Sequence, residues 1–230
     1  EEVCAHYGHT FPVPETMPWT TAASLPEVLC TAWLNLVWLG LVGKDARVLI
    51  HAGASGVGTI GIQVVRHLCG RVWVTAGSED KIARCVALGA EGGANRQTTS
   101  FAEHAKDWTD GHGFDCILDP VGGAYLQDNL RHLATGGRLV VIGLMGGRTA
   151  ELDLGRLLVK RLQVLGSTLR SRPEDEKTSL VAAIRHLCWD AVLQGDIRPV
   201  VDRVFPATAI ADAHAHLASN QTVGKVVLEL

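Results

Sequence analysis

The segment 47–63, RVLIHAGASGVGTIGIQ, constrains the fold of this chain more than any other. A short apolar run that ends at Ala52 predicts a buried strand, and the apolar-periodic residues after Gly58 predict a helix. The turn between them has to be tight and open to close approach, which small residues allow. Free N–H groups at the start of such a helix bind phosphate. Strand, glycine turn and helix therefore predict a fold that binds a nicotinamide dinucleotide.

The glycine pattern of this turn is imperfect, because Ser55 replaces the second glycine of GxGxxG. Serine is small, and its hydroxyl can donate to a phosphate oxygen. Two alternatives stay open, namely a glycine-rich connection in another α/β fold and the GxSxG nucleophile turn of a hydrolase. The hydrolase is disfavoured because Val57 stands where that motif needs its second glycine. Gly61 favours the dinucleotide fold, since it lets the helix pack closely on the sheet.

Strand-like and helix-like segments alternate along most of the chain. The predicted strands are 47–52, 71–76, 93–95, 114–119, 138–142 and 162–165, and the predicted helices between them are 27–42, 57–69, 79–88, 101–108 and 125–134. This alternation predicts an α/β protein with a doubly wound parallel Rossmann sheet. A helix from 174 to about 193, a strand at 200–205, a helix at 210–218 and a strand at 225–230 follow, and these late strands do not extend the sheet.

The composition fits a compact α/β protein, with 47% hydrophobic and 20% charged residues in 230. A net charge of −3 leaves no broad basic surface, so we expect no nucleic-acid partner. We expect no membrane partner either, because the apolar run 29–42 is short and interrupted. The six cysteines form no CxxC pair and no zinc-finger spacing with histidine, and no secretory leader is visible. These features predict a reduced, cytoplasmic setting.

The end of the second predicted strand decides which nicotinamide cofactor the chain prefers. NAD-specific folds carry an acidic residue there, whereas this chain has Gly77 and Ser78. Lys81 follows at the start of the next helix, so a hydroxyl and an ammonium group can hold a 2′-phosphate. Arg96, after the third strand, is a second candidate. The alternative for both cations is an ordinary solvated side chain.

Other polar clusters give weaker signals. His6 and His9 lie in a proline-broken segment with no third metal ligand at suitable spacing, so we predict no metal site. Asp115 and Asp119 flank a predicted strand and are interpreted as caps of its ends. His214 and His216 are two residues apart and so face different sides of a helix. No catalytic residue is assigned from these patterns.

Several motifs together resemble one known family. They are HAGASGVG at 51–58, TAGS at 75–78, GLMGG at 143–147, LRSR at 169–172 and VGKVVLEL at 223–230, with the lead-in ASLPE at 23–27. The chain resembles the zinc-independent, medium-chain NADPH:quinone oxidoreductases of the zeta-crystallin-like group. The match is ordered along nearly all 230 residues.

The resemblance implies a set of cofactor-binding residues. The turn would hold the diphosphate, Ser78 and Lys81 the 2′-phosphate, and Arg96 stands where relatives have a tyrosine near the adenosine. Thr31 would lie near the nicotinamide end, Leu144 and Met145 would pack by the nicotinamide, and Leu169 and Ser171 would close the far side. The full implied set is Thr31, Gly53, Ala54, Ser55, Gly56, Val57, Gly58, Ser78, Lys81, Arg96, Leu144, Met145, Leu169 and Ser171.

The resemblance also implies a domain plan. Residues 1–26 would be a remnant of a GroES-like catalytic domain, 27–195 the NADP-binding Rossmann domain, and 196–230 a segment that returns to the catalytic domain. Remnants of the GroES-like β domain would thus lie at both termini. Because family members carry roughly a hundred further residues in front, we expect an N-terminally truncated chain.

Two functions of different class follow. The first is an NADPH-dependent oxidoreductase that transfers hydride to a quinone or an α,β-unsaturated carbonyl, a reaction that needs no metal in this family. The second is a catalytically silent NADPH-binding protein, a truncated isoform that acts as scaffold or sensor. The resemblance and the apolar segment 162–168 further imply a homodimer that pairs across a sheet edge.

Overall fold

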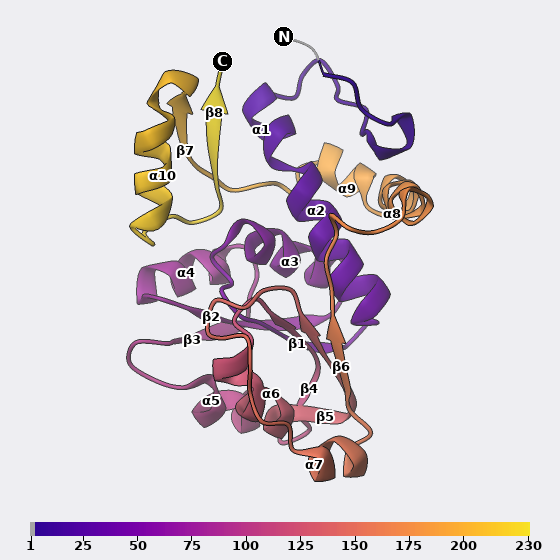
Figure 1. Cartoon of the computed structure of the whole chain (residues 1–230), viewed down its shortest axis with the longest axis vertical. Helices are drawn as coiled ribbons and strands as arrows, with labels where there is room; N and C mark the ends of the chain where they lie inside the picture. The colour runs from indigo at the N-terminus through magenta and orange to yellow at the C-terminus, as the bar shows by residue number, and fades with distance from the viewer. Residues whose placement is uncertain (1–2) are drawn as a thin grey trace.

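A six-stranded parallel sheet forms the centre of the molecule, as seen in the computed structural model, which describes residues 3–230 (Figure 1). The strand order is β3-β2-β1-β4-β5-β6, and every neighbouring pair is parallel. Chain order reverses between β1 and β4, which is the switch point of a doubly wound fold. The predicted Rossmann sheet is confirmed. Its strands are β1 (Arg47–Ile50), β2 (Arg71–Ala76), β3 (Gly92–Asn95), β4 (Phe114–Asp119), β5 (Leu133–Val141) and β6 (Gln163–Gly166).

Helices cover both faces of this sheet (Figure 1). Val48 and Ile50 of β1 belong to the core that includes α3, whereas Leu49 belongs to the core that includes α5 and α6. Alternate residues of a strand point to opposite faces, so one apolar strand supplies both cores. The helices that contact its strands include α3 (Gly56–His67), α4 (Glu79–Ala87), α5 (Phe101–Trp108) and α6 (Leu126–His132). Farther from the sheet, α2 (Pro26–Ala32) packs on α3, and α8 (Glu174–Leu187), which is followed by α9 (Trp189–Leu193), packs on α2.

The apolar stretch before β1 is a core helix of the fold. It runs from α1 (Trp19–Ser24) through α2 into η2 (Trp33–Leu39), which has π-helical hydrogen bonding. By length and composition alone, residues 19–39 could cross a membrane, but 56% of the most apolar window is buried inside the fold. Leu29 and Leu34 have no exposed surface, and Trp33 is almost fully covered. Burial of α2 and η2 against α3, β4 and β5 accounts for this apolar composition.

A smaller unit stands apart from the main sheet, near both chain ends (Figure 1). Its two strands, β7 (Val201–Pro206) and β8 (Lys225–Glu229), pair in parallel, and α10 (Ile210–Ala218) connects them after the short η4 (Ala207–Ala209). The prediction that the late strands do not extend the main sheet is confirmed. Within residues 3–26, the structure describes η1 (Tyr7–His9) and α1 and no strand.

Several element boundaries differ from the sequence-based predictions. The helix predicted at 125–134 is a short turn, η3 (Gly123–Tyr125), followed by α6, and β5 begins at Leu133 rather than at 138. The helix predicted to reach 193 breaks at Cys188 into α8 and α9. Neither α1 nor α7 (Leu154–Val159) was predicted. These helices are six residues long, too short for an apolar period to become visible.

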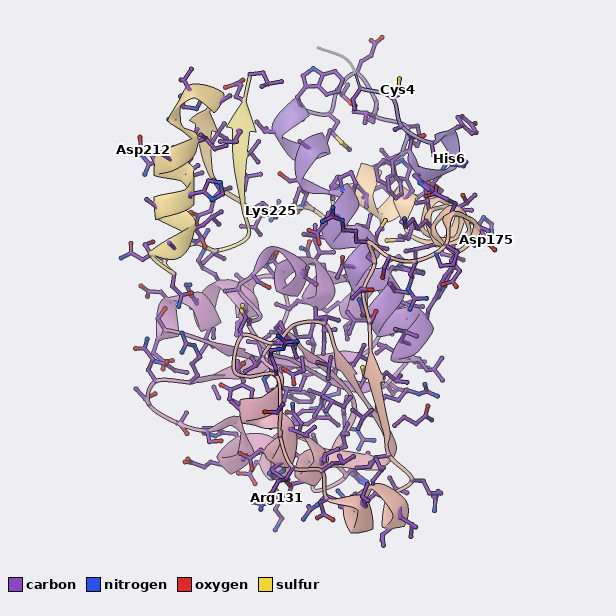
Figure 2. The ribbon with its side chains drawn as sticks, in the orientation of Figure 1. Cys4, His6, Arg131, Asp175, Asp212 and Lys225 are labelled. Carbon is purple, nitrogen blue, oxygen red and sulfur yellow. The ribbon has the colours of Figure 1, made fainter. Side chains whose placement is uncertain are left out.

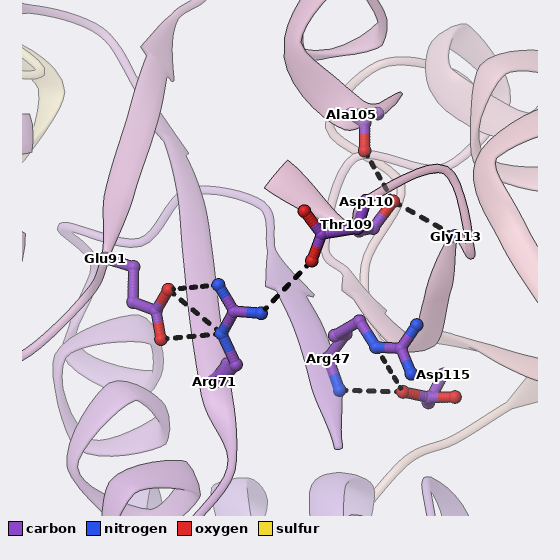
Figure 3. Close-up of polar contacts among 8 residues, drawn as sticks. All are labelled: Arg47, Arg71, Glu91, Ala105, Thr109, Asp110, Gly113 and Asp115. Carbon is purple, nitrogen blue, oxygen red and sulfur yellow. Dashed lines mark hydrogen bonds and ion pairs between the residues drawn. The ribbon is translucent and has the colours of Figure 1, made fainter. Parts of the chain in front are cut away.

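Polar side chains at the amino ends of the strands pair with one another (Figure 3). Arg71 donates two hydrogen bonds from Nε and Nη2 to Glu91, at 3.0 and 2.8 Å, and lies 3.8 Å from Asp110. Asp115 accepts a hydrogen bond from the Arg47 backbone N–H at 2.7 Å. Asp115 thus lies within β4 and holds the start of the neighbouring β1, rather than capping an end of its own strand as predicted. These hydrogen bonds and ion pairs hold the amino edge of the sheet together.

The cysteines divide into two exposed and four buried thiols, which gives a first test of the fold. Burial raises the pKa of Cys30, Cys116 and Cys188 to about 12 and that of Cys85 to about 11, whereas Cys4 and Cys69 are exposed. Since the thiolate is the reactive form, we expect iodoacetamide to modify only Cys4 and Cys69 in the native protein. Peptide mass spectrometry with and without denaturant measures this, and fast native labelling of Cys116 would contradict the packing.

Candidate nucleotide-binding site

The glycine-rich turn after β1 has the geometry of an anion-binding helix start. Ser55 is the N-cap of α3, and its Oγ accepts the Gly58 N–H at 3.0 Å. This bond leaves the hydroxyl hydrogen free to donate to a ligand. A Cβ at Gly58 would lie 2.5 Å from the Gly53 carbonyl oxygen, and a Cβ at Gly53 would lie 2.5 Å from Val74. Gly53 is therefore required for the turn to pack against β2, and Gly58 is required for α3 to start against the backbone of the turn itself.

The start of β8 also supports this turn, which sequence analysis missed. The Gly224 N–H donates to the Ala54 carbonyl at 2.8 Å, and Ser55 and Gly224 form an isolated parallel bridge. The aliphatic chain of Lys225 lies over Gly56, where a Cβ would meet Lys225 Cδ at 2.5 Å. Lys225 is labelled in Figure 2 between β8 and α2. The motif VGK at 223–225 belongs to the motifs of the resemblance, but its contact with the turn arises only in the folded structure.

Thr31 reaches the turn indirectly. Its Oγ1 donates to Glu27 Oε1 at 3.2 Å, and Glu27 Oε2 lies 3.3 Å from Lys225 Nζ. Thr31 and Lys225 are half-buried, so this chain of contacts lies at the surface between α2 and β8. The structure thus links Thr31 to the glycine turn through Glu27 and Lys225.

Two cations lie close to the end of β2, where Gly77 and Ser78 follow the strand. A Cβ at Gly77 would lie 3.5 Å from Arg96 Nη2, so the guanidinium covers this glycine. Ser78 caps α4 by accepting the Lys81 N–H at 3.3 Å. Burial lowers the pKa of Lys81, and the neighbouring charge of Arg96 lowers it further. Such a pair of nearby like charges is stabilised by an anion placed between them.

Lys81 also holds the loop after α10, because its Nζ donates to the Asn220 carbonyl at 2.7 Å. This loop forms the outer wall of a cleft of about 830 Å³ whose inner wall is the start of α4. The cleft is lined by Gly77, Ser78, Asp80, Lys81, Ala83, Arg84, Gln97, Ser219, Asn220, Gln221 and Val223. No sequence signal marks residues 219–221 as a wall, since they are placed by the connection between α10 and β8.

A second hollow of about 370 Å³ lies beside the first, between the end of β3 and α5. Arg96 and Gln97 line it, together with Tyr125 and Phe101. Since Gln97 lines both hollows, they are neighbours along the carboxyl edge of the sheet. A polar hollow lined by Lys81 and Arg84, next to a hollow lined by Arg96 and aromatic side chains, suits a phosphorylated adenosine.

The remaining predicted residues lie on loops that follow β5 and β6. Leu144 and Met145 are exposed, at 51% and 72%. Their loop is held against the β4 end, because the Met145 N–H donates to the Pro120 carbonyl at 3.2 Å. Leu169 is half-buried against the main core, and Ser171 is exposed with its hydroxyl on Thr168. All predicted site residues therefore lie at the carboxyl edge of the sheet or on α2 beside it.

The fold supplies a third polar group to the histidine pair near the N-terminus. Potential ligand atoms of His6, His9 and Glu174 lie within 4.8 Å of one another, where η1 and its N-cap His6 meet the start of α8. Figure 2 labels His6 in this region, close to Asp175 of α8. However, His6 Nδ1 accepts the Gly8 N–H at 3.1 Å, and His9 Nε2 faces the Glu174 carbonyl at 3.2 Å. These contacts pack η1 on α8. Among residues 3–230 this is the one such group of three, and one ring nitrogen of each histidine is hydrogen-bonded, His6 to Gly8 and His9 to Glu174.

A parallel sheet with this strand order and this glycine turn defines a dinucleotide-binding Rossmann protein. A family model described as zinc-binding dehydrogenase matches residues 56–185. The quinone oxidoreductase-like protein 2 of Rattus norvegicus is 30% identical over 219 residues, which cover 95% of this chain and 62% of that protein.

Two solved structures have the same fold over nearly the whole chain. The quinone oxidoreductase of Thermus thermophilus, also solved in complex with NADPH, is 34% identical with a TM-score of 0.84, covering 96% of this chain and 69% of that one. The CurK enoyl reductase is 28% identical with a TM-score of 0.83, covering 98% and 67%.

These matches identify the family. The chain belongs to the zinc-binding dehydrogenase family of medium-chain dehydrogenases and reductases, in its quinone oxidoreductase-like group. It spans between 9% and 66% of the length of curated relatives that it matches.

Proposed function

We propose that the chain belongs to an NADPH-dependent oxidoreductase that transfers hydride to a quinone or an α,β-unsaturated carbonyl. The observation that carries the choice of NADPH is the cation pair of Lys81 and Arg96 beside Gly77 and Ser78. Glu79 and Asp80 are exposed in the first turn of α4, where acidic residues favour the helix dipole. The names of the two solved relatives support both acceptor classes, one a quinone oxidoreductase and the other an enoyl reductase.

The chain's own residues would bind and orient the cofactor. The N–H groups of the turn 53–58 and the Ser55 hydroxyl hold the diphosphate at the start of α3. Lys81, Arg96 and the Ser78 hydroxyl hold the 2′-phosphate of the adenosine. Leu144 and Met145 supply an apolar surface for the nicotinamide, and the segment of Leu169 and Ser171 closes the far side.

NADPH, when bound, supplies the hydride from its nicotinamide ring. The protein then contributes orientation, because a fixed ring and acceptor convert an encounter into a near-unimolecular step. Thr31 and the Lys225–Glu27 pair fix the position of α2 against the turn. No side chain is assigned as a catalytic residue, since hydride transfer from an oriented ring needs none and the anion formed on the acceptor takes its proton from water.

One experiment separates this proposal from the catalytically silent alternative. NADPH binding is titrated by ligand fluorescence, and NADPH oxidation is followed with an ortho-quinone and with an enone as acceptors. Binding with turnover supports the oxidoreductase. Binding without turnover supports the silent protein, which the exposure of Leu144 and Met145 favours, because the predicted nicotinamide end is open to water. If NADPH gives no protection against thermal unfolding, both functions fail.

The homodimer is part of the same proposal. β6 is an edge strand, and beside it the side chains of Leu154, Leu158 and Val159 in α7 are 65%, 77% and 73% exposed. Apolar surface at an unpaired edge favours pairing with a second copy.

We expect Val164→Lys to convert the dimer to a monomer, since a charge on an edge strand opposes edge-to-edge pairing. Sedimentation velocity of both proteins measures this. Val204→Lys is the matched control, because Val204 lies in β7 and is 39% exposed, against 38% for Val164. A dimer that survives Val164→Lys would place the interface elsewhere.

A further inference from the structure

Four buried polar side chains lie near the carboxyl ends of the central strands, and the proposed function assigns a role to none of them. His51 follows β1, Thr75 lies in β2, Asp119 ends β4, and Asn129 lies in α6. Their exposed fractions are 1%, 3%, 0% and 0%. Buried polar groups are costly unless they are hydrogen-bonded, so the arrangement of their partners is informative.

The four side chains form one continuous series of hydrogen bonds. Asn129 Nδ2 lies 3.0 Å from Asp119 Oδ2, and Asn129 Oδ1 lies 2.7 Å from His51 Nε2. His51 Nδ1 lies 3.1 Å from Thr75 Oγ1. Thr75 Oγ1 also lies 3.3 Å from the backbone nitrogen of Ala52, the residue that leads into the glycine turn.

The direction of every bond in this series follows from the carboxylate. An ionised Asp119 can only accept, so the Asn129 amide must donate to it and present its oxygen to His51. His51 therefore carries its proton on Nε2, and its Nδ1 accepts from the Thr75 hydroxyl. That hydroxyl oxygen in turn accepts the Ala52 N–H. Burial lowers the pKa of His51, although the charge of Asp119 acts against this, so the neutral ring is the relevant form.

The other oxygen of Asp119 binds the loop after β4, which lies against the predicted nicotinamide loop 143–147. Oδ1 accepts the N–H groups of Val121 and Gly122 at 2.6 and 3.0 Å. The loop they belong to is bonded to the loop 143–147, since the Gly146 N–H donates to the Val121 carbonyl at 2.7 Å. Asp119 is thus hydrogen-bonded to the backbone at 121–122, which holds the predicted nicotinamide loop 143–147. Through the side chains of Asn129, His51 and Thr75, it is also connected to the predicted diphosphate turn.

We propose that Asp119, Asn129, His51 and Thr75 form a one-directional hydrogen-bond relay that positions the glycine turn and the loop 143–147 relative to each other. This inference rests on the proposed function, because it concerns the two ends of the same cofactor crevice. The four are positioning residues, and they act across the switch point where β1 and β4 lie side by side. The interpretation of Asp119 as a strand cap is correct but describes only one of its two oxygens.

The relay is tested by reversing its direction with Asp119→Asn. The new amide keeps its oxygen on the two backbone N–H groups, so its NH2 faces Asn129. The Asn129 amide then has to turn over, and His51 must move its proton from Nε2 to Nδ1. Long-range 1H–15N spectra of the apo protein report this tautomer directly. We expect the switch in Asp119→Asn, together with shifts at the Ala52 and Gly146 amides and a rise of about tenfold in the Kd of NADPH.

Thr109→Val is the matched control. Thr109 is also fully buried and bonded, with Oγ1 on the Ala105 carbonyl at 2.7 Å, but it lies at the amino edge of the sheet (Figure 3). It is expected to lower the melting temperature while leaving the His51 tautomer and the Kd of NADPH unchanged. The relay is overturned if His51 keeps its proton on Nε2 in Asp119→Asn. It is also overturned if the Kd of NADPH rises no more in Asp119→Asn than in Thr109→Val.

A second pair of variants keeps the test decisive if Asp119→Asn does not fold. Thr75→Val removes the last link, whereas Thr75→Ser retains the hydroxyl. We expect the Ala52 amide to shift and the Kd of NADPH to rise several-fold only in Thr75→Val. Equal behaviour of the two variants contradicts the relay. If the wild-type protein does not bind NADPH, the proposed function fails, while the tautomer and amide measurements still decide the relay.

Discussion

Gly58→Ala is expected to destabilise the protein by about 3 kcal/mol, a loss of roughly 6–12 °C in Tm, and to weaken NADPH binding by at least about tenfold. The added Cβ would lie 2.5 Å from the Gly53 carbonyl oxygen and 2.6 Å from that of Ala52. Both atoms belong to backbone that is fixed by bonds to neighbouring strands, so the turn itself has to move. Thermal unfolding and a fluorescence titration with NADPH measure the two effects.

Gly43→Ala is the matched control for this change. A Cβ at Gly43 meets nothing within 4 Å, so the same substitution should leave both stability and NADPH affinity close to wild type. If Gly58→Ala binds NADPH as tightly as Gly43→Ala does, the turn is not the diphosphate site. A loss of stability without a loss of affinity would lead to the same conclusion.

Lys81→Ala is expected to weaken NADPH binding by about ten- to a hundredfold and to leave NADH binding nearly unchanged. The ammonium group lies in the cleft beside Arg96, and a hydrogen bond between charged groups is worth about 1.5–3 kcal/mol. Only NADPH carries the 2′-phosphate that this group would bind. Parallel titrations of both cofactors give the ratio of affinities, which is the decisive quantity.

The control for Lys81→Ala has to separate charge from structure. Lys44→Ala removes an exposed lysine before β1, at the opposite edge of the sheet, and should change neither affinity. Lys81→Ala also removes the bond to the Asn220 carbonyl, so its melting temperature is measured beside the titrations. Equal losses for NADPH and NADH would refute the 2′-phosphate role and attribute the effect to the α10–β8 loop.

The sequence predicted the central sheet well because its signals are local. Each strand is a short apolar run, each helix has an apolar period, and the turn 53–58 has a composition that few other structures need. The predicted boundaries of helices and strands were wrong where they depend on contacts with residues distant in the chain. Leu133 to Gly137, LATGG, lacks the apolar run of a strand, yet β5 begins there because Leu133 pairs with Phe114 of β4, before a register shift leads to the pair of Arg138 and Cys116.

The residues of the candidate site also divide into those that local sequence identified and those that only the fold brings together. Ser55, Ser78 and Lys81 were identified from their positions after predicted strands, and the structure places them at one edge of the sheet. Asn220 and Lys225 were not identified, because they belong to a unit that is remote in sequence. His6 and His9 lacked a third polar partner by spacing, and the fold brings Glu174 to them across 165 residues.

Taken alone, the amino-acid sequence determined the order of strands and helices, the parallel sheet and the glycine turn between β1 and α3, since these depend on neighbours along the chain. Tertiary structure decided which remote groups meet at the carboxyl edge: the loop after α10 against Lys81, β8 against the glycine turn, and Asp119 with Asn129 against His51. Such contacts depend on packing between elements far apart in the chain, where residue spacing carries no information about distance.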